Sequence, residues 1–510
     1  MMGVINIVTR SQVNQIRVTA GSDSREQIDL QWGGSQQEWK WDLAVHGLKD
    51  QGDEYSIRDL RIQDPRRELL ADLKLGYQDT QVSILHSSDK SEGFYTSANL
   101  AEDYNDYQKE FDHIWVQQAY AVTEDWQMDL AFGYQAIGQD IHVQSLAPGA
   151  LAAVSSPSSN APLLVRALAE SRQSSFKWAN DMSLSSRQSI QWGMEWSNAT
   201  VERAKTLSNF DTLALLQRRF PVGFSSDLSF VTTIMGNESK TLNAIYGQYL
   251  LDLSEKTRLT LGLRHDDYRD VDSRTSPRLG LVYMANETHT FKLLYGEAFR
   301  APSLVELYTM NNSGLLGNPD LVSERVNTCE FIWQAKVSDL SSSINLFSNK
   351  LVNPIINDFQ PGSGIRTYAS GPDADYQGGE FNLDWQPSQG WLLSYSFSWI
   401  NNLPDDAFRE ADRIQQVRLQ YEAERWSWNL SLVEQGDREY LLSTTQRARL
   451  DSDQLLYSRI HYQLTQDIDL DFTVKNLGDS DVRSSAHGVV ALGGVPHRGR
   501  EWALGLTWGW

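Results

Sequence analysis

The last ten residues of the chain alternate strictly between large apolar and small or polar side chains. The apolar side chains are those of Trp502, Leu504, Leu506, Trp508 and Trp510. Successive side chains of a β-strand point to opposite faces, so a period of two gathers all of these on one face. Residues 391–399 and 467–473 repeat the pattern, and three aspartates occupy the polar face of the second segment. Each segment is therefore predicted to be a β-strand with one apolar face and one hydrated face.

Two architectures fit this alternation, and the connections between strands choose between them. In a soluble sandwich the apolar face points into a core, whereas in a membrane barrel it points to lipid and water fills the inside. Membrane barrels have short turns at one end and long loops at the other. Short turns are predicted at residues 34–35, 79–80, 123–125, 185–187, 254–256, 286–288 and 338–340. Long polar segments lie between them in strict alternation, which favours the barrel.

The predicted strands are residues 12–20, 25–33, 38–48, 67–78, 80–92, 109–121, 125–140, 171–184, 188–203, 240–253, 257–268, 275–285, 289–299, 325–337, 341–353, 374–386, 391–402, 412–422, 426–436, 453–465, 467–477 and 500–510. They predict an all-β fold, a transmembrane antiparallel up-and-down β-barrel of about 22 strands with short periplasmic turns and long extracellular loops. An even count puts both termini on the periplasmic side. No window reaches the roughly 18 to 20 apolar residues of a spanning helix.

Composition supports a membrane interface and excludes several functions. The chain has 17 Trp and 20 Tyr, residues that membrane barrels concentrate in two interfacial girdles. The net charge of −21 argues against nucleic acid as a partner, because a phosphate-binding surface must be basic. A single cysteine, Cys329, leaves no internal disulfide, and no HExxH, GxxxxGK[ST] or GxSxG motif occurs. We therefore expect no enzymatic activity, no cofactor and no bound metal.

Four stretches resemble motifs of TonB-dependent outer-membrane receptors. Residues 3–10, which read GVINIVTR, are similar to the strand that closes the plug domain of these receptors, and residues 474–479 are similar to their penultimate strand. Two further stretches resemble the family's FRAP and NPxL boxes, namely Phe299, Arg300, Ala301 and Pro302 for the first and Asn318 and Pro319 for the second. Both boxes lie in the seventh long loop, where the family carries them. The resemblance covers nearly the whole chain.

This resemblance implies a receptor that carries a scarce ligand, by default a ferric siderophore, across the bacterial outer membrane. In the family the ligand binds the loops and the plug, then passes through the lumen when the TonB complex pulls on the plug. Residues 1–10 are expected to be the remnant of the last plug strand and residues 11–510 the barrel. The rest of the plug is expected upstream of Met1, so the implied partners are outer-membrane lipid and, only through the missing plug region, TonB. The terminal aromatic residues Trp508 and Trp510 are expected to serve as the assembly signal.

Aromatic and cationic side chains of the predicted loops are candidate ligand contacts, because rings offer rigid contact area and cations attract anionic chelates. They are Tyr95, Tyr104, Tyr107, Arg366, Tyr368, Tyr376, Arg438, Tyr440 and Arg498. Loop packing or interfacial anchoring is the alternative for each of them. For Arg300 and Pro302 we favour a structural role, in which the box caps a strand and fixes the exit of the loop.

Several alternatives stay open on the sequence. Haem receptors of the family carry a histidine between the two boxes, and residues 303–317 contain none, which disfavours haem. Cobalamin, a sugar or a peptide are alternatives to the siderophore. Asp266, Asp267, Asp270 and Asp272 fit no EF-hand spacing and are interpreted as a solvated loop. The rival classes are a passive porin-like channel without a plug and a soluble β-rich carbohydrate-binding protein.

Overall fold

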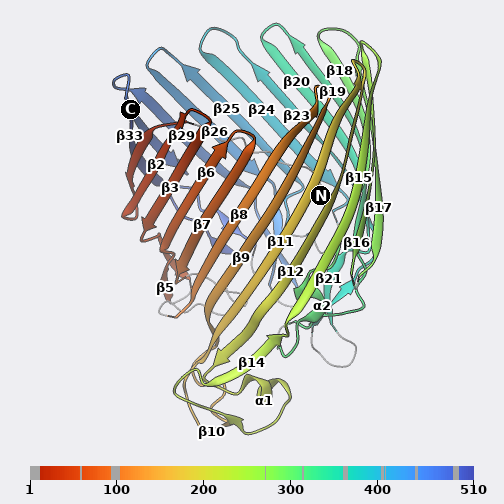
Figure 1. Cartoon of the computed structure of the whole chain (residues 1–510). Coiled ribbons are helices and arrows are strands. Elements are labelled where there is room, and N and C mark those ends of the chain that lie inside the picture. Colours follow the sequence, from red (N-terminus) through yellow and green to blue (C-terminus); the bar gives the residue numbers. More distant parts are fainter. Residues whose placement is uncertain are drawn as a thin grey trace.

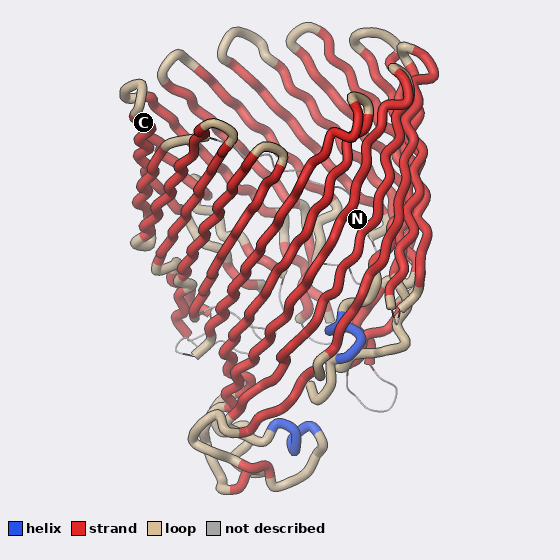
Figure 2. The backbone as a smooth tube through the Cα atoms, viewed as in Figure 1, coloured by secondary structure: helices blue, strands red, loops and turns tan. Residues whose placement is uncertain are grey.

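The computed structural model describes residues 12–57, 60–93, 104–269, 271–312, 315–359, 366–403, 407, 409–442, 446–485 and 493–510. Antiparallel strands wind into one tilted, closed barrel (Figures 1 and 2). The barrel strands are β1 (Gln15–Gly21), β2 (Arg25–Gln36), β3 (Trp39–Asp50), β6 (Arg66–Tyr77), β7 (Thr80–Glu92), β8 (Asp106–Thr123), β9 (Trp126–Leu146), β11 (Leu163–Ser185), β12 (Gln188–Ser208), β15 (Glu238–Ser254), β16 (Thr257–Tyr268), β17 (Ser273–Met284), β18 (His289–Arg300), β19 (Glu324–Val337), β20 (Leu340–Val352), β23 (Ala374–Trp385), β24 (Trp391–Asn401), β25 (Arg413–Glu422), β26 (Trp426–Gln435), β29 (Asp453–Gln463), β30 (Ile468–Lys475) and β33 (Glu501–Gly509).

Closure of the sheet comes from its first and last strands. Val18 of β1 lies opposite Ile28 of β2 on one side and opposite Leu506 of β33 on the other. Among the described residues the sheet has 23 strands, but β14 (Phe230–Met235) only continues the line of β15 along β12, so 22 positions complete the ring. The predicted barrel of about 22 strands is confirmed, and closure leaves no unpaired edge for lipid to meet.

The two ends of the barrel differ, as Figure 2 shows. At the turn end, neighbouring strands are joined by tight connections such as residues 78–79 and 338–339, whereas long segments join strands at the loop end. The predicted turn at 34–35 is wrong by three residues, because β2 runs on to Gln36 and the chain reverses at Gln37, whose φ is +57°. The predicted strict alternation also fails twice, since residues 22–24 and 269–272 are short connections at the loop end.

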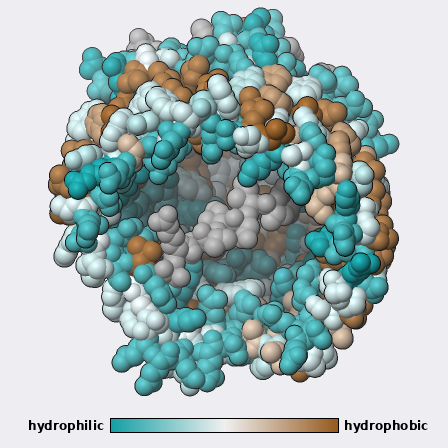
Figure 3. Space-filling model, turned by 90° about the horizontal axis from the view of Figure 1, so that it is seen from above, coloured by the Kyte–Doolittle hydropathy of each residue, from teal (hydrophilic) through white to brown (hydrophobic). Residues whose placement is uncertain are grey.

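The outer face of the barrel is apolar and carries aromatic residues near the turn end (Figure 3 shows apolar groups around its rim). Large outward side chains beside the turns are well exposed; they include Trp39, Tyr77, Tyr120, Tyr283, Trp385, Trp426, Tyr462 and Trp508. Such amphipathic rings prefer the boundary between lipid and water. No helix of the described residues has the length and apolarity needed to cross a membrane.

Three neighbouring strands extend beyond the rest at the loop end, where they carry a small lobe (Figure 1). β9, β11 and β12 have 21, 23 and 21 residues. The lobe contains β10 (Ser155–Ser156), α1 (Thr212–Leu216) and β13 (Val222–Gly223), and it is held by a buried cluster that includes Phe210 and Val222. Other loop-end elements are the hairpins β4–β5 (Glu54–Ile57 and Leu60–Gln63), β21–β22 (Ile355–Phe359 and Arg366–Ser370) and β27–β28 (Arg438–Leu441 and Arg447–Leu450), the pair β31–β32 (Arg483–Ser484 and Val495–Pro496), and α2 (Leu304–Tyr308).

Candidate functional site: the lumen and its loop end

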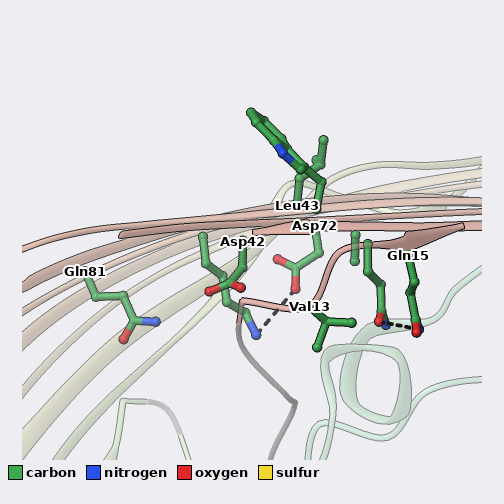
Figure 4. Close-up of a pocket in the computed structure, with 10 residues that line it drawn as sticks. Val13, Gln15, Asp42, Leu43, Asp72 and Gln81 are labelled. Atoms are coloured by element: carbon green, nitrogen blue, oxygen red, sulfur yellow. Dashed lines mark hydrogen bonds and ion pairs between the residues drawn. The ribbon is translucent and has the colours of Figure 1, made fainter. Parts of the chain in front are cut away.

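The inner face of the barrel is polar, opposite in character to the outer face. Figure 4 shows one stretch of wall, where Asp42, Asp72 and Gln81 point to one side of the sheet and Leu43 to the other. These residues line a cavity of about 530 Å³ on β1, β2, β3, β6 and β7. Because adjacent residues of a strand alternate between faces, the sequence pattern that places Leu43 in lipid also places Asp42 in the lumen.

Charged side chains of the lumen wall are paired across strands. Asp471 is 3% exposed and is met by Arg17, at 3.2 Å, and by Arg459. On the far wall Arg264 lies between Glu195, at 2.7 Å, and Asp266, at 2.8 Å. Pairing offsets the cost of holding these charges away from bulk water. The wall therefore offers hydrogen-bonding groups along its length while carrying few isolated charges.

The FRAP-like box forms an ionic clamp where β18 ends. Arg300 donates from Nε to Glu324 at 2.6 Å and from Nη1 to Glu306 at 2.8 Å. Ser303 and Glu306 form a capping box at the start of α2. Burial alone would raise the pKa of Glu306, but the hydrogen bonds from Arg300 and Ser303 outweigh it and the pKa is lowered. Pro302 is fully buried and Ala301 nearly so, a geometry that fits the structural role we favour for the box.

The loop after the box, residues 301–323, is fastened to its neighbours on three sides. Lys240 of β15 donates to the carbonyl of Pro302 at 2.9 Å, and its ammonium lies 5.3 Å from the ring centre of Tyr268, whose edge meets Phe299. The amide of Met310 donates to the carbonyl of Ile234 in β14 at 2.7 Å. On the third side the loop meets the β21–β22 hairpin, where Asn318 donates to the carbonyl of Tyr368 at 3.0 Å. Pro319, the next residue of the NPxL-like box, is exposed.

A second joint ties the loop between β3 and β6 to the loop that leads into β33. Arg498 donates to Asp50 at 3.0 Å and to Asp64 at 2.8 Å, and its side chain is 19% exposed. Burial raises the pKa of Asp64 against the opposing hydrogen bond from Arg498. Tyr55 completes the joint by donating to Asp64 at 3.3 Å.

The remaining predicted contacts are spread around the loop end and do not form one cluster. Tyr95 lies outside the described residues. The ring of Tyr104 packs edge-on against His142 at 5.6 Å, and Tyr107 accepts a hydrogen bond from Gln139 at 3.0 Å. Buried positions are taken by Tyr376, Arg438 and Tyr440, and exposed or half-buried ones by Arg366 and Tyr368. Arg438 is paired with Asp453, so its charge is engaged within the protein.

The interpretation of the four aspartates as a solvated loop is wrong for two of them, because Asp266 and Asp267 lie in β16 and Asp266 is buried, with 3% of its surface exposed. Asp266 is held by Arg264 and Asp272 by Arg274, while Asp270 lies outside the described residues. Among the residues that the structure describes, no group of three or more acidic, histidine or cysteine side chains could hold a metal ion. At the C-terminus the rings of Trp508 and Trp510 lie 5.3 Å apart on the outer face.

Sequence reasoning missed one feature of the lumen. Phe111, His113 and Trp115 stack on the inward face of β8, with ring centres 6.1 and 6.2 Å apart. The signal was an aromatic residue at every second position, on the face opposite to Ile114 and Val116.

Comparison with known proteins gives one family match and several relatives. A family model described as TonB dependent receptor-like, beta-barrel, matches residues 31–477. The ferric enterobactin receptor PirA of Pseudomonas aeruginosa is 30% identical over 218 residues, which are 38% of this chain and 28% of that protein. The vitamin B12 transporter BtuB of Vibrio cholerae is 24% identical over 251 residues, which are 48% of this chain and 38% of that protein. The matched segments thus span well under half of either relative.

Solved structures share the fold across nearly the whole chain. A mutant of the ferric enterobactin receptor PfeA from Pseudomonas aeruginosa superposes with a TM-score of 0.77 at 15% identity, covering 98% of this chain and 81% of that chain. The siderophore receptor PirA from Acinetobacter baumannii gives 0.74 at 15% identity, with 99% and 81% covered. The copper transporter OprC gives 0.75 at 15% identity, with the same coverage. At this identity the likeness concerns the fold alone.

Proposed function

This chain belongs to the TonB-dependent receptor family through its β-barrel, and we propose that it takes up a ferric siderophore across the bacterial outer membrane. The family consists of receptors that transport ligands rather than of enzymes. The observation that carries the proposal is the closed 22-strand wall with an apolar outer face and a polar, charge-paired lumen. Such a wall keeps lipid outside and water inside, and at this size it leaves a lumen that a plug has to fill.

The ligand class is supported by the relatives and by the chemistry of the loop end. One curated relative and two of the superposed structures are described as receptors of ferric enterobactin or of siderophores. Aromatic and cationic side chains at the loop end, including the exposed Arg366 and the half-buried Tyr368, suit an anionic chelate. We therefore propose the nine candidate contacts named from the sequence as the residues to test first.

Cobalamin is the second candidate. The relative that matches 251 residues of this chain is described as a vitamin B12 transporter. Cobalamin is bulky and far less charged than a ferric chelate, so it would rely on ring and amide contacts more than on cations.

Energy coupling is proposed to act through a plug in the lumen. The first described residues are consistent with a chain that enters from inside the barrel, because the amide of Gln12 donates to the inward carboxylate of Asp42 and Asn14 accepts from the amide of Gly33 at 3.0 Å. We propose residues 1–10 as the last plug strand, although they lie outside the described residues, and residues 11–510 as the barrel. TonB would then reach this protein only through the plug.

Uptake by cells that depend on this receptor tests the proposal. Strains lacking their own siderophore receptors would express the gene with its upstream reading frame and receive radioactive iron as a catecholate chelate, a hydroxamate chelate or citrate, with labelled cobalamin alongside. Uptake of one iron chelate that stops when the proton gradient is collapsed supports the proposal. Uptake of cobalamin alone would replace the ligand, and leakage of every small solute regardless of energy would favour the porin-like channel.

A further inference from the structure

The inward face of β8 carries an unusual run of side chains for a polar lumen. From the loop end toward the middle of the barrel it presents Tyr107, Lys109, Phe111, His113 and Trp115. Their outward neighbours Ile114 and Val116 are exposed apolar residues of the outer face, which fixes the opposite set as inward. These five residues, four of them aromatic rings, are named the β8 ladder.

The rings of the β8 ladder are stacked in a regular way. The planes of Phe111 and His113 are inclined by 13° and those of His113 and Trp115 by 27°. The centre-to-centre spacings of 6.1 and 6.2 Å follow the two-residue repeat of a strand, which is about 6.7 Å. Each ring therefore lies two residues further along the strand than the last. A planar group that leaves one ring meets the face of the next ring within about the same distance.

Neighbouring strands leave room for this stack. Gly133 lies opposite Trp115 on β9, and a Cβ there would stand 2.8 Å from the Trp115 ring and 2.6 Å from the hydroxyl of Ser175. Any residue other than glycine would thus push the indole out of line. Two of the flanking positions are apolar, with Leu85 opposite His113 and Ile137 opposite Phe111, whereas the others carry Gly133 or the polar residues Ser83, Ser87 and Gln135.

The loop end of the ladder adds a cation. Lys109 is exposed and forms no ion pair within the described part of the chain, while its cross-strand neighbour Asp89 is engaged by Arg66 at 3.1 Å. Tyr107, one step nearer the loops, already accepts a hydrogen bond from Gln139. A lysine at the entrance followed by three rings matches a ligand that joins negative charge to planar aromatic groups.

We propose that the β8 ladder binds the planar rings of an anionic aromatic ligand inside the lumen, such as the aryl groups of a catecholate iron chelate. This inference rests on the proposed function and deepens it, since it names the chemical class of the ligand. Lys109 attracts the charge, and the stacked rings then bind the aryl groups in successive positions along the wall.

The test is equilibrium binding to the purified protein in detergent micelles, with the ferric complex of 2,3-dihydroxybenzoate as the aromatic probe and ferric citrate as the ring-free anion. The variant Phe111→Ser with Trp115→Ser is expected to bind the aromatic probe about tenfold more weakly, because each ring contact contributes about 0.5 to 1.5 kcal/mol. Binding of ferric citrate is expected to stay the same. Trp115→Phe should restore most of the affinity, and Phe111→Ser alone serves if the double variant does not fold.

Tyr457→Ser is the matched control, because Tyr457 is an inward aromatic residue on a distant strand of the wall, β29, and belongs to no stack within the described residues. It is expected to leave both affinities unchanged. Equal binding of the aromatic probe by the wild type and by the folded ladder variants would overturn the β8 ladder alone, and would mean that the rings only pack against the protein. Failure of the wild type to bind any iron chelate would instead remove the proposed function, and the ladder with it.

Discussion

Replacing Arg498 with methionine is expected to destabilise the joint between two loops that are far apart in the sequence. The guanidinium donates to both carboxylate oxygens of Asp50, at 3.0 and 3.2 Å, and to Asp64 at 2.8 Å. The side chain of Asp50 is 2% exposed, so water cannot take the place of the lost partner. Removing one member of a buried ion pair costs about 3 to 5 kcal/mol, because the other charge is left uncompensated.

We expect the lower end of that range for Arg498→Met. Asp50 keeps a hydrogen bond from the amide of Gly52 at 3.1 Å and a weaker contact with Arg25 at 4.0 Å. A loss of about 3 kcal/mol corresponds to a change of about a hundredfold in the unfolding equilibrium. Adding Asp50→Asn to Arg498→Met should recover part of the loss, since it removes the stranded charge.

The loss of stability caused by Arg498→Met is also expected to depend on pH. Burial already raises the pKa of Asp64 above its ordinary value of 3.8 in the folded protein, even though Arg498 opposes the shift. A carboxyl whose folded pKa is raised stabilises the fold fully below pH 3.8 and loses that contribution as the pH rises through the folded value. Without Arg498 the upward shift of the Asp64 pKa grows. The free energy of unfolding of the variant should therefore differ most from that of the wild type near neutral pH and least near pH 4.

Urea unfolding in lipid vesicles, followed by tryptophan fluorescence, would measure the effect. Arg500→Met is the matched control, because Arg500 and Asp479 are 3.4 Å apart and both about half exposed, and such surface pairs contribute about 0 to 1 kcal/mol. If Arg498→Met costs no more than Arg500→Met, the buried joint does not hold these loops together and the argument from burial is refuted.

Three further outcomes are expected. Leu506→Arg on the outer face should lower the free energy of unfolding by about 2 to 4 kcal/mol in the same assay. Thr507→Arg should lower it far less, because Thr507 points into the lumen beside its cross-strand partner Asp469. Equal losses would contradict the assignment of faces. The lowered pKa of Glu306 means that its carboxylate stabilises the fold above pH 4.5 and that this contribution is lost as the pH falls below 4.5. Hydrogen exchange in α2 should therefore accelerate on acidification. An exchange rate that does not change with pH would rule out the clamp. Trp510→Ser should lower the yield of heat-modifiable barrel in outer membranes, and a normal yield would show that the terminal ring is not an assembly signal.

The spanning part of the fold was predictable because each strand obeys one local rule. In β24 and β33 the apolar residues of one face must meet lipid and the others water, so the period of two is written directly into the sequence. The rule fails where strands leave the membrane. β11 was expected to begin at residue 171 and begins at Leu163, because residues 163–170 read LLVRALAE and place apolar side chains on both faces, so no alternation of apolar and polar residues marks them as a strand. Nothing in an alternation count marks such an extension.

The loop end was predictable in its residues but not in their partners. Arg498 was chosen as a ligand contact because it is a loop cation, yet its partners Asp50 and Asp64 precede it by 448 and 434 residues. Only closure of the barrel brings the first and last loops together, and sequence spacing carries no trace of it. The structural role favoured for Arg300 was argued from Pro302, which denies an amide to the strand ladder, and not from its partners Glu306 and Glu324, which follow it by 6 and 24 residues. Whether any of the nine candidates touches a ligand stays a prediction.

Chemical labelling of one strand tests the central claim that lipid surrounds the barrel and water fills it. In a chain with Cys329 replaced by serine, a cysteine would be placed singly at Ser396 or at Phe397, adjacent residues in the middle of β24. Ser396 lies beside Asn382 on the inner face, and Phe397 lies beside Phe381 on the outer face. In native outer membranes a water-soluble maleimide should label the cysteine at position 396 and not the one at 397. Labelling at position 397 with protection at 396 would mean a dry interior and a wet exterior, and the barrel receptor would be the wrong account.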